Sequence, residues 1–201
     1  MPALSIAAYT MSNQPTISHA TQEDVKEILA MIRELADYEH ELSSVEATEE
    51  SLTRTLSLAP SAQSSHTNPG HAKCIMLRLP TEPKSSTDVP GAVAGMALYF
   101  HNYSTWNGKQ GIYLEDLFVR PQYRKRGYGK LLIQALAREN LLQDGGRLEW
   151  SCLDWNEPSL QFYRSLGAVE MKGWTKLRVD GEALQKLAMG DIPPIKGEAP
   201  K

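Results

Sequence analysis

Hydrophobic residues in the first third of the chain follow a helical period. Apolar side chains recur between Val25 and Leu35 at spacings of three and four, which predicts a helix with one buried face. Thr21 and the acidic residues that follow it predict the N-cap, and we expect the helix to end around Tyr38. A strand containing Ile17 should precede this helix, and a shorter helix capped by Thr48 should follow it near residues 52–56.

Apolar runs in the middle of the chain predict strands. A short strand at 73–79 lies between two polar loops, at 59–70 and 80–90, where Ser, Pro, Asn and Gly are frequent. Two further strands, at 93–100 and 111–119, are separated by a segment that contains the pair Asn107-Gly108. This pair is typical of a hairpin turn, so we expect the two strands to be antiparallel neighbours.

The last third of the chain alternates between helical and strand patterns. A helix is expected at 130–142 and a strand at 147–153, followed by a helix that Asn156 caps and Gly167 ends. A final strand at 174–179 and a short helix at 182–187 should complete the order. We therefore predict an α/β fold with a mixed sheet.

A turn with two glycines, Gly127 and Gly129, joins the strand that ends at Val119 to the helix that follows. Such a turn directs backbone N–H groups and the positive end of the helix dipole at one point, which suits a phosphate. It is not a P-loop, because Arg124 and Leu131 replace the required Gly and hydroxyl residue. It is not a dinucleotide fingerprint either, because position 132 is Leu. A purely structural glycine turn is the alternative interpretation.

Composition narrows the class of protein. The 201-residue chain is 41% hydrophobic, enough for one domain with a core, and its net charge of -3 argues against a nucleic-acid partner. Basic residues nevertheless cluster around the glycine turn at Arg120, Arg124, Lys125, Arg126 and Lys130, where they would either bind phosphate or form a solvated loop.

The chain carries no sign of export. No apolar segment is long enough for a membrane span, and the first residues lack the features of a signal peptide, so we expect a cytoplasmic protein without a membrane partner. Cys74 and Cys152 show no metal-ligand spacing, and we expect two buried, reduced thiols.

Glu115 and Asp116 are adjacent carboxylates in a strand that should be central and apolar, where an unpaired charge is costly. For both to serve one site, the strict alternation of the strand must be broken, so we predict a β-bulge near 116–118. The bulge would also free a backbone N–H at Leu117 or Val119 to polarise a carbonyl oxygen. The alternative is that neighbouring backbone groups or a salt bridge satisfy both carboxylates.

Three motifs together resemble the GNAT acetyltransferases. They are Arg124-x-x-Gly127-x-Gly129, the strand 112–119, and the segment 153–159 followed by Phe162-Tyr163. The resemblance extends from about Thr16 to about Ala188 and is to the diamine acetyltransferase branch, which includes spermidine/spermine and thialysine acetyltransferases. It implies the GNAT fold with a mixed central sheet flanked by helices, acetyl-CoA as co-substrate, no metal, a small amine as acceptor and a homodimer. We expect the domain at 15–189, with insertions about 59–72 and 80–90, a flexible extension at 1–14 and a disordered tail at 190–201.

The resemblance also implies roles for individual residues. Glu115 would act as general base through water, and Tyr163 would protonate the departing thiolate. The cofactor-binding residues would be Leu117, Phe118, Val119, Arg124, Lys125, Arg126, Gly127, Tyr128, Gly129, Lys130, Asn156, Glu157, Pro158 and Ser159. The substrate-binding residues would be Tyr38, Glu39, Trp106, Asp116, Glu149, Trp150 and Ser151. The alternative for each is a structural role, such as a core aromatic residue or an ordinary N-cap.

Two departures from the polyamine enzymes bear on the acceptor. Ser104 stands where those enzymes carry an aspartate, and the loop at 170–172 is shorter and contains Lys172. Because lost carboxylates weaken the binding of a long polycation more than that of a short amine, we favour thialysine or another lysine analogue. A polyamine acetyltransferase is the first alternative. An acetyl-CoA-binding or protein-acetylating module is the second.

Overall fold

The structure is a computed structural model that describes residues 13–64, 69–82 and 88–191. Contacts divide the chain into two units, Met1–Glu157 and Pro158–Lys201. The first unit holds the sheet together with helices α1 (Val25–Tyr38), α2 (Glu49–Thr55) and α3 (Tyr128–Leu142). Helix α4 (Glu157–Ser165) begins at the boundary, and α5 (Gly181–Ala188) belongs to the second unit. Of the extension expected at 1–14 and the tail expected at 190–201, residues 1–12 and 192–201 lie outside the described residues.

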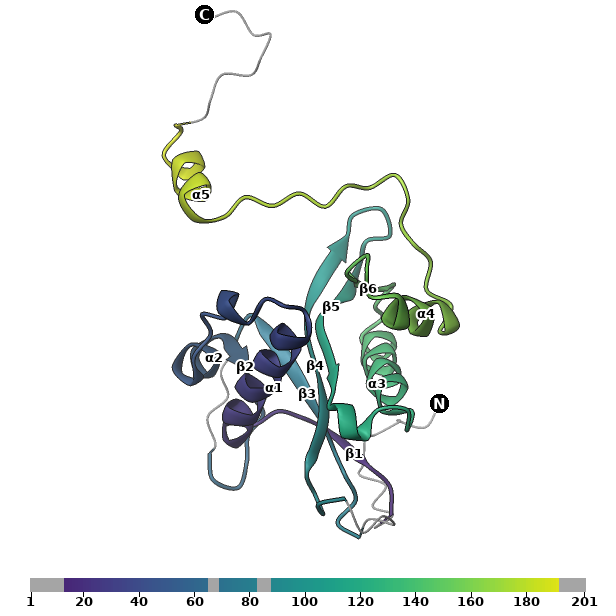
Figure 1. Ribbon diagram of the computed structural model, residues 1–201. Helices are drawn as coiled ribbons and strands as arrows, with labels where there is room; N and C mark the ends of the chain where they lie inside the picture. Colours follow the sequence, from purple (N-terminus) through teal and green to yellow (C-terminus); the bar gives the residue numbers. More distant parts are fainter. Residues whose placement is uncertain (1–12, 65–68, 83–87, 192–201) are drawn as a thin grey trace, which may run out of the picture. The chain divides into compact units, whose positions relative to one another are not determined.

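The sheet is mixed, as predicted, with the strand order β1–β3–β4–β5–β6. Neighbours are antiparallel from β1 to β5, whereas β6 runs parallel to β5 and β2 runs parallel to β3. Helices α1 and α3 cover opposite faces of this sheet (Figure 1). The strands are β1 (Thr16–His19), β2 (Leu56–Ser57), β3 (Ala72–Arg78), β4 (Val93–Ser104), β5 (Lys109–Val119) and β6 (Leu148–Trp150).

The local signals in the first part of the chain are confirmed. Thr21 and Asp24 form a capping box ahead of α1, and Thr48 accepts a hydrogen bond from the backbone of Ser51 at the start of α2. Helix α1 ends at Tyr38, as predicted, and buries the side chains that the helical period placed on one face. Val25, Ile28 and Leu29 are buried, Ile32 and Leu35 are partly buried against the core, and Met31, which the predicted face did not include, is buried as well.

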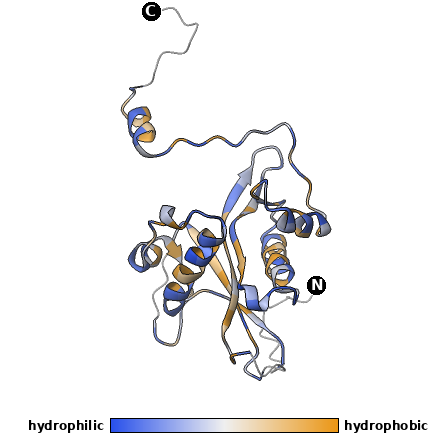
Figure 2. Ribbon diagram, viewed as in Figure 1, coloured by the Kyte–Doolittle hydropathy of each residue, from blue (hydrophilic) through white to orange (hydrophobic). Residues whose placement is uncertain are grey.

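The apolar core lies on both faces of the sheet. Beneath α1, the helix packs on side chains from β3, β4 and β5, including Met76, Leu98 and Phe118. In Figure 2 the orange of apolar residues is concentrated on the central strands, whereas the hairpin end of β4 is blue. The first unit therefore has a rigid apolar centre and a polar hairpin end.

The predicted bulge exists, but one position earlier than expected. Leu98 pairs with Asp116 while Tyr99 pairs with Leu114, so Glu115 is the extra residue of β5. The extra residue shifts the alternation of side chains by one position. Tyr113 and Asp116 therefore both project to the α1 face although they are three residues apart, a spacing that would place them on opposite faces of a regular strand.

Strand β6 is shorter than the predicted strand at 147–153. It pairs with β5 only from Ile112 to Leu114, and the bulge follows immediately. Because a strand needs a partner ladder to persist, β6 ends at Trp150 where β5 departs from it. Cys152, which we expected to be buried in this strand, consequently lies beyond it and is partly exposed, whereas Cys74 is buried as predicted; both are free thiols.

The strand predicted at 174–179 is wrong. Those residues form no ladder in the part of the chain that the structure describes. A strand requires a neighbour with free backbone groups as well as suitable residues, and the described residues of the second unit form no such neighbour. Helix α5 is confirmed and is one residue longer at each end than expected.

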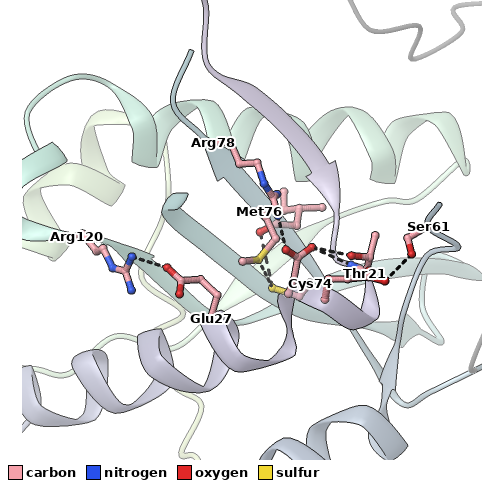
Figure 3. Close-up of polar contacts among 10 residues, drawn as sticks. Thr21, Glu27, Ser61, Cys74, Met76, Arg78 and Arg120 are labelled. Carbon is pink, nitrogen blue, oxygen red and sulfur yellow. Dashed lines mark hydrogen bonds and ion pairs between the residues drawn. The ribbon is translucent and has the colours of Figure 1, made fainter. Parts of the chain in front are cut away.

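Arg120, at the end of β5, anchors α1 to the sheet. Its guanidinium donates to Glu34 from Nη2 at 2.7 Å and to Glu27 from Nη1 at 2.5 Å, and it also reaches the Val93 carbonyl at 3.3 Å. Figure 3 shows the pair of Arg120 with Glu27 on the helix, and it also shows Arg78. Arg78 pairs with Asp24 just before the helix. Asp24, Glu27 in the first turn and Glu34 in the second half of α1 are thus tied to the sheet by charge-assisted contacts.

We expect Arg120→Ala to lower the free energy of unfolding by about 2 kcal/mol, because it leaves two partly shielded glutamates without their cation. Urea denaturation would measure the change. Lys109→Ala is the matched control, since it removes the exposed ion pair with Asp144 and should cost about 1 kcal/mol or less. Equal losses in the two variants would contradict the anchoring role.

Candidate functional site

The glycine turn adopts the backbone conformation that its sequence requires. Gly127 has φ 79° and is the N-cap of α3, and Lys125 before it has φ 61°. The helix starts two residues earlier than predicted, at Tyr128. The N–H groups of the first turn, from Tyr128 to Lys130, have no partner within the helix and lie at the positive end of its dipole. The turn can therefore hold a phosphate at the start of α3.

The basic cluster around this turn divides into two sets. Arg120 is committed to Glu27 and Glu34, and Arg126 pairs with Asp88 at 2.7 Å. In contrast, neither Lys125 nor Lys130 has an ion-pair partner among the residues that the structure describes. The two lysines are the cations of this cluster that remain available to an anion.

Arg124 has a different role from the other basic residues. Its Nε donates to the Val119 carbonyl at 2.8 Å, and its guanidinium lies 5.3 Å from the ring centroid of Tyr38 and 5.6 Å from that of Phe118. It therefore connects the end of β5, the glycine turn and the end of α1 through a hydrogen bond and cation–π contacts.

The edge of β5 beyond the bulge is open. The Arg120 N–H donates to the Ala94 carbonyl across the β4–β5 ladder, so alternation directs the N–H groups of Leu117 and Val119 to the other edge of the strand. On that edge β6 pairs only with residues 112–114. No strand in the described part of the chain covers Leu117 or Val119, and both N–H groups face the side from which β6 has departed.

Three carboxylates gather where the bulge meets the C-terminal end of α1. Burial, and then the charges of Glu115 and Glu39, raise the pKa of Asp116 to about 6. Burial also raises the pKa of Glu39. None of the three has an ion-pair partner within the described residues, so the site carries uncompensated negative charge. A cation such as an ammonium group would be stabilised here.

The end of α1 packs against the loop that precedes α4. The Tyr38 hydroxyl donates to Asn156 Oδ1 at 3.1 Å, and the Tyr38 ring lies 5.9 Å from that of Trp155. His40 stacks on the other part of Trp155 at 6.0 Å. These contacts bring Tyr38, Glu39 and Asn156, which were predicted separately, to one place beside Arg124 and the carboxylates.

The three predicted substrate residues of β6 and its continuation do not all lie on one face of the sheet. Glu149 pairs with Tyr113 and lies on the α1 face, as does Ser151, whose Oγ is 2.8 Å from the Tyr113 hydroxyl. Trp150 pairs with Leu114 and therefore projects to the opposite face. Trp106 is not brought to the carboxylates either, because it lies in the hairpin turn and is 88% exposed.

Sequence reasoning missed Phe100 and Tyr113, whose stacked rings, 5.1 Å apart, lie next to Glu149 on the α1 face. The period-two pattern on both strands of the hairpin could have identified them. Tyr163 lies in α4 within the second unit, with its ring 5.2 Å from Phe162. Pro158 and Ser159 belong to the same helix, and Glu157 is its first residue.

The described residues contain neither a metal-ligand cluster nor a helix suited to span a membrane. No group of His, Cys, Asp and Glu side chains there could hold a metal ion. None of the described helices has both the length and the apolar character that crossing a membrane requires.

Residues 30–168 match the acetyltransferase (GNAT) family. The chain is 36% identical over 178 residues to thialysine N-epsilon-acetyltransferase of Sus scrofa, covering 86% of this chain and 96% of that enzyme. It is 43% identical over 105 residues to L-ornithine N5-acetyltransferase of Arabidopsis thaliana, covering 52% of this chain and 45% of the relative. It is also 29% identical to human spermidine/spermine N(1)-acetyltransferase-like protein 1, covering 86% of this chain and 23% of that protein.

Solved structures with the same fold include an integron cassette protein from the mobile metagenome of V. cholerae. The TM-score is 0.65 at 24% sequence identity, and the match covers 87% of this chain and 97% of that protein. An aminoglycoside acetyltransferase from an uncultured soil metagenomic sample has a TM-score of 0.62 and 15% identity, with coverage of 83% and 97%. These similarities show the fold.

The raised pKa of Asp116 has a consequence for stability. The folded protein holds this proton up to a pH of about 6, whereas the ordinary value is 3.8, so the contribution of Asp116 to stability falls as the pH rises from about 4 to about 6. Asp116→Asn should therefore raise the free energy of unfolding above pH 7, by up to ~3 kcal/mol, and have little effect near pH 4. Thermal unfolding at pH 4.5 and 8 would measure this difference.

Asp144→Asn is the control for this substitution, because Asp144 is highly exposed and, among the described residues, forms its ion pair with Lys109. It should give no such pH-dependent gain. A wild-type protein more stable than Asp116→Asn at pH 8 would show that Asp116 is satisfied in its charged form.

Proposed function

Because the chain belongs to the acetyltransferase (GNAT) family, we propose that it transfers the acetyl group of acetyl-CoA to the terminal amine of a lysine-like amino acid, with thialysine as the favoured acceptor. One observation carries the proposal: two of the three carboxylates, Glu115 and Asp116, lie on β5 immediately before its open edge, and Glu39 at the end of α1 is close enough to raise the pKa of Asp116. An amine and an acyl carbonyl could thus meet at adjacent positions of β5. The similarity to the Sus scrofa thialysine enzyme, over 96% of its length, supports the choice of acceptor.

The described residues fit acetyl-CoA. The glycine turn at Gly127 and Gly129, with Lys125 and Lys130, would bind the pyrophosphate. The outward N–H groups of Leu117 and Val119 would lie along the pantetheine arm and polarise the thioester carbonyl. Asn156 and the start of α4, at residues 157–159, complete the proposed cofactor-binding set, together with Phe118, Arg124, Arg126 and Tyr128.

The carboxylates would prepare the amine. A lysine-like ammonium has a pKa near ~10.4, so its deprotonation at pH 7 costs about 4 to 5 kcal/mol. Asp116 and Glu39 would hold the ammonium, and Glu115, which is exposed to solvent, would accept its proton through water. The neutral nitrogen then forms the N–C bond as the C–S bond breaks. Tyr163 would supply the proton to the departing sulfur.

The structure offers a reason for a short acceptor. Ser104, at the place where an aspartate would read a distant ammonium, is buried and its Oγ accepts the Asn107 N–H at 3.3 Å within the hairpin turn. It therefore carries no charge for a polyamine and serves the turn instead. Spermidine acetylation remains the alternative that the similarity to the human spermidine/spermine relative supports.

We also propose that the protein works as a cytoplasmic homodimer. Residues 174–179 carry apolar side chains, including Trp174 and Leu177, and form no ladder in the described part of the chain. In a homodimer a second copy would cover them, and the double variant Trp174→Asp/Leu177→Asp should then sediment as a monomer. A wild-type protein that sediments as a monomer at micromolar concentration would contradict the homodimer. The two free thiols are consistent with a reducing compartment.

The acceptor assignment is tested by comparing amines with the purified full chain. We expect kcat/KM for thialysine to exceed that for spermidine by at least tenfold, because a second ammonium finds no carboxylate at Ser104. Release of free CoA would be measured for thialysine, L-ornithine, L-lysine and spermidine. A preference for spermidine would overturn the thialysine assignment and leave acetyl transfer to an amine intact.

The role of Tyr163 is tested by Tyr163→Phe. The variant should lower kcat on the order of a hundredfold and leave the dissociation constant of acetyl-CoA nearly unchanged, because only the transferable proton is removed. Phe162→Leu, at the neighbouring position, serves as the control for helix packing. If kcat of Tyr163→Phe stays within twofold of the wild type, Tyr163 has a structural role.

A further inference from the structure

A second polar group lies on the same face as the carboxylates, toward the hairpin end of the sheet. Asn102 of β4 pairs with Gly111 of β5, and Arg147 lies against Gly111 from the other side, where its carbonyl accepts the Ile112 N–H. The next rung on this face is Phe100, Tyr113 and Glu149. The group formed by Asn102, Arg147 and Glu149 is here called the distal triad.

Gly111 allows the distal triad to close over the strand. A Cβ at this position would lie 2.6 Å from Asn102 Oδ1 and 2.8 Å from Arg147 Cγ, so any other residue would force the two side chains apart. Asn102 Oδ1 is buried and has no hydrogen-bond partner within the described residues. The arrangement therefore brings a buried acceptor and a cation together above one backbone position.

The distal triad differs from the carboxylate cluster in its charge. Glu149 Oε2 accepts a hydrogen bond from Asn102 Nδ2 at 2.6 Å and lies 2.8 Å from Arg147 Nε. The Arg147 Nε–H is not aligned with this oxygen, so the contact is an ion pair without a hydrogen bond. Glu149 is thus compensated, whereas Glu39, Glu115 and Asp116 are not.

Arg147 retains donors for a ligand. Its Nη2 donates to the Tyr103 carbonyl at 3.3 Å, and the side chain is 37% exposed. A guanidinium has five N–H donors in a planar fork, and the contacts within the described residues use only one side of it. The open side suits a carboxylate, which can accept two parallel hydrogen bonds from an arginine.

The separation of the two groups matches an amino acid. Four residues of β5 separate Gly111 from Glu115, a rise of about 13 Å. An extended lysine-like amino acid, together with one protein side chain that extends toward it, covers this distance. The end of the site at Glu115 is acidic and suits an ammonium group. The end at Gly111 is neutral overall and presents the guanidinium of Arg147.

We propose that Arg147, held in place by Glu149 and Asn102, binds the α-carboxylate of the acceptor and so determines selection of amino acids over polyamines. This inference rests on the proposed function and names its specificity determinant. A polyamine would place an ammonium where Arg147 stands, which is unfavourable, whereas an amino acid pairs both of its charged ends. Thialysine and L-ornithine, the amino acids in the names of the two relatives, both carry this carboxylate.

The experiment compares thialysine with its decarboxylated analogue, which keeps the reacting amine and lacks only the carboxylate. The wild type should prefer thialysine in kcat/KM by at least tenfold. Arg147→Gln should raise KM for thialysine about tenfold or more. It should increase the rate with the analogue and with spermidine, both of which carry a second ammonium, because Glu149 is then uncompensated. Glu149→Gln should lower the rate with spermidine below that of the wild type, because it removes the carboxylate that compensates Arg147.

Lys109→Gln is the matched control, since it removes a cation from the same end of the sheet, where Lys109 pairs with Asp144. It should leave the ratio of the two substrates unchanged. The opposite signs expected for Arg147→Gln and Glu149→Gln separate recognition from a loss of folding, which would lower the rate with every amine in both variants. Arg147→Lys should restore part of the preference for thialysine.

Two results would overturn the inference: equal kcat/KM of the wild type for thialysine and the analogue, or an Arg147→Gln variant that keeps the preference. Either result leaves acetylation of a small amine standing. If the wild type acetylates no amine in the panel, the proposed function fails. Calorimetric binding of thialysine and its analogue to the wild type and Arg147→Gln then decides the role of Arg147 separately.

Discussion

The extra residue at Glu115 is the constraint on which the site depends. It sets Asp116 on the α1 face and ends the pairing between β5 and β6 within one residue. The same irregularity therefore produces two features: a carboxylate cluster on one face of the strand and an open backbone edge at Leu117 and Val119. A regular strand at this position would pair with β6 along its length and leave no N–H free for an acyl carbonyl.

Helix α1 brings a third carboxylate, that of Glu39, close to Asp116 beside the bulge. Arg120 ties its middle to the end of β5, and Arg124 and Asn156 hold Tyr38 at its end. These contacts keep Glu39 close enough to contribute to the raised pKa of Asp116. The anchoring arginines and the glycine turn are neighbours in sequence, so the segment 120–130 positions both the amine end and the phosphate end of the proposed site.

The sequence predicted best what depends on local chemistry. The caps at Thr21 and Thr48, the helical face of α1 and the hairpin turn at Asn107-Gly108 were all confirmed, because each rests on residues close together in the chain. The predictions of a strand at 147–153 and of another at 174–179 were wrong in length and in existence, respectively. A strand depends on a partner strand that is distant in the sequence. The ion pairs of Arg120 and the distal triad could not be predicted, since they join residues far apart in sequence.

We propose above all that the open edge of β5 binds the acyl and pantetheine part of acetyl-CoA. Amide hydrogen exchange of the full chain, resolved by NMR with and without coenzyme A, tests it most directly. We predict that the N–H groups of Leu117 and Val119 become strongly protected when the ligand binds, while that of Ile112, already bonded to Arg147, changes little. Unchanged exchange at Leu117 and Val119 in a protein saturated with coenzyme A would contradict the account.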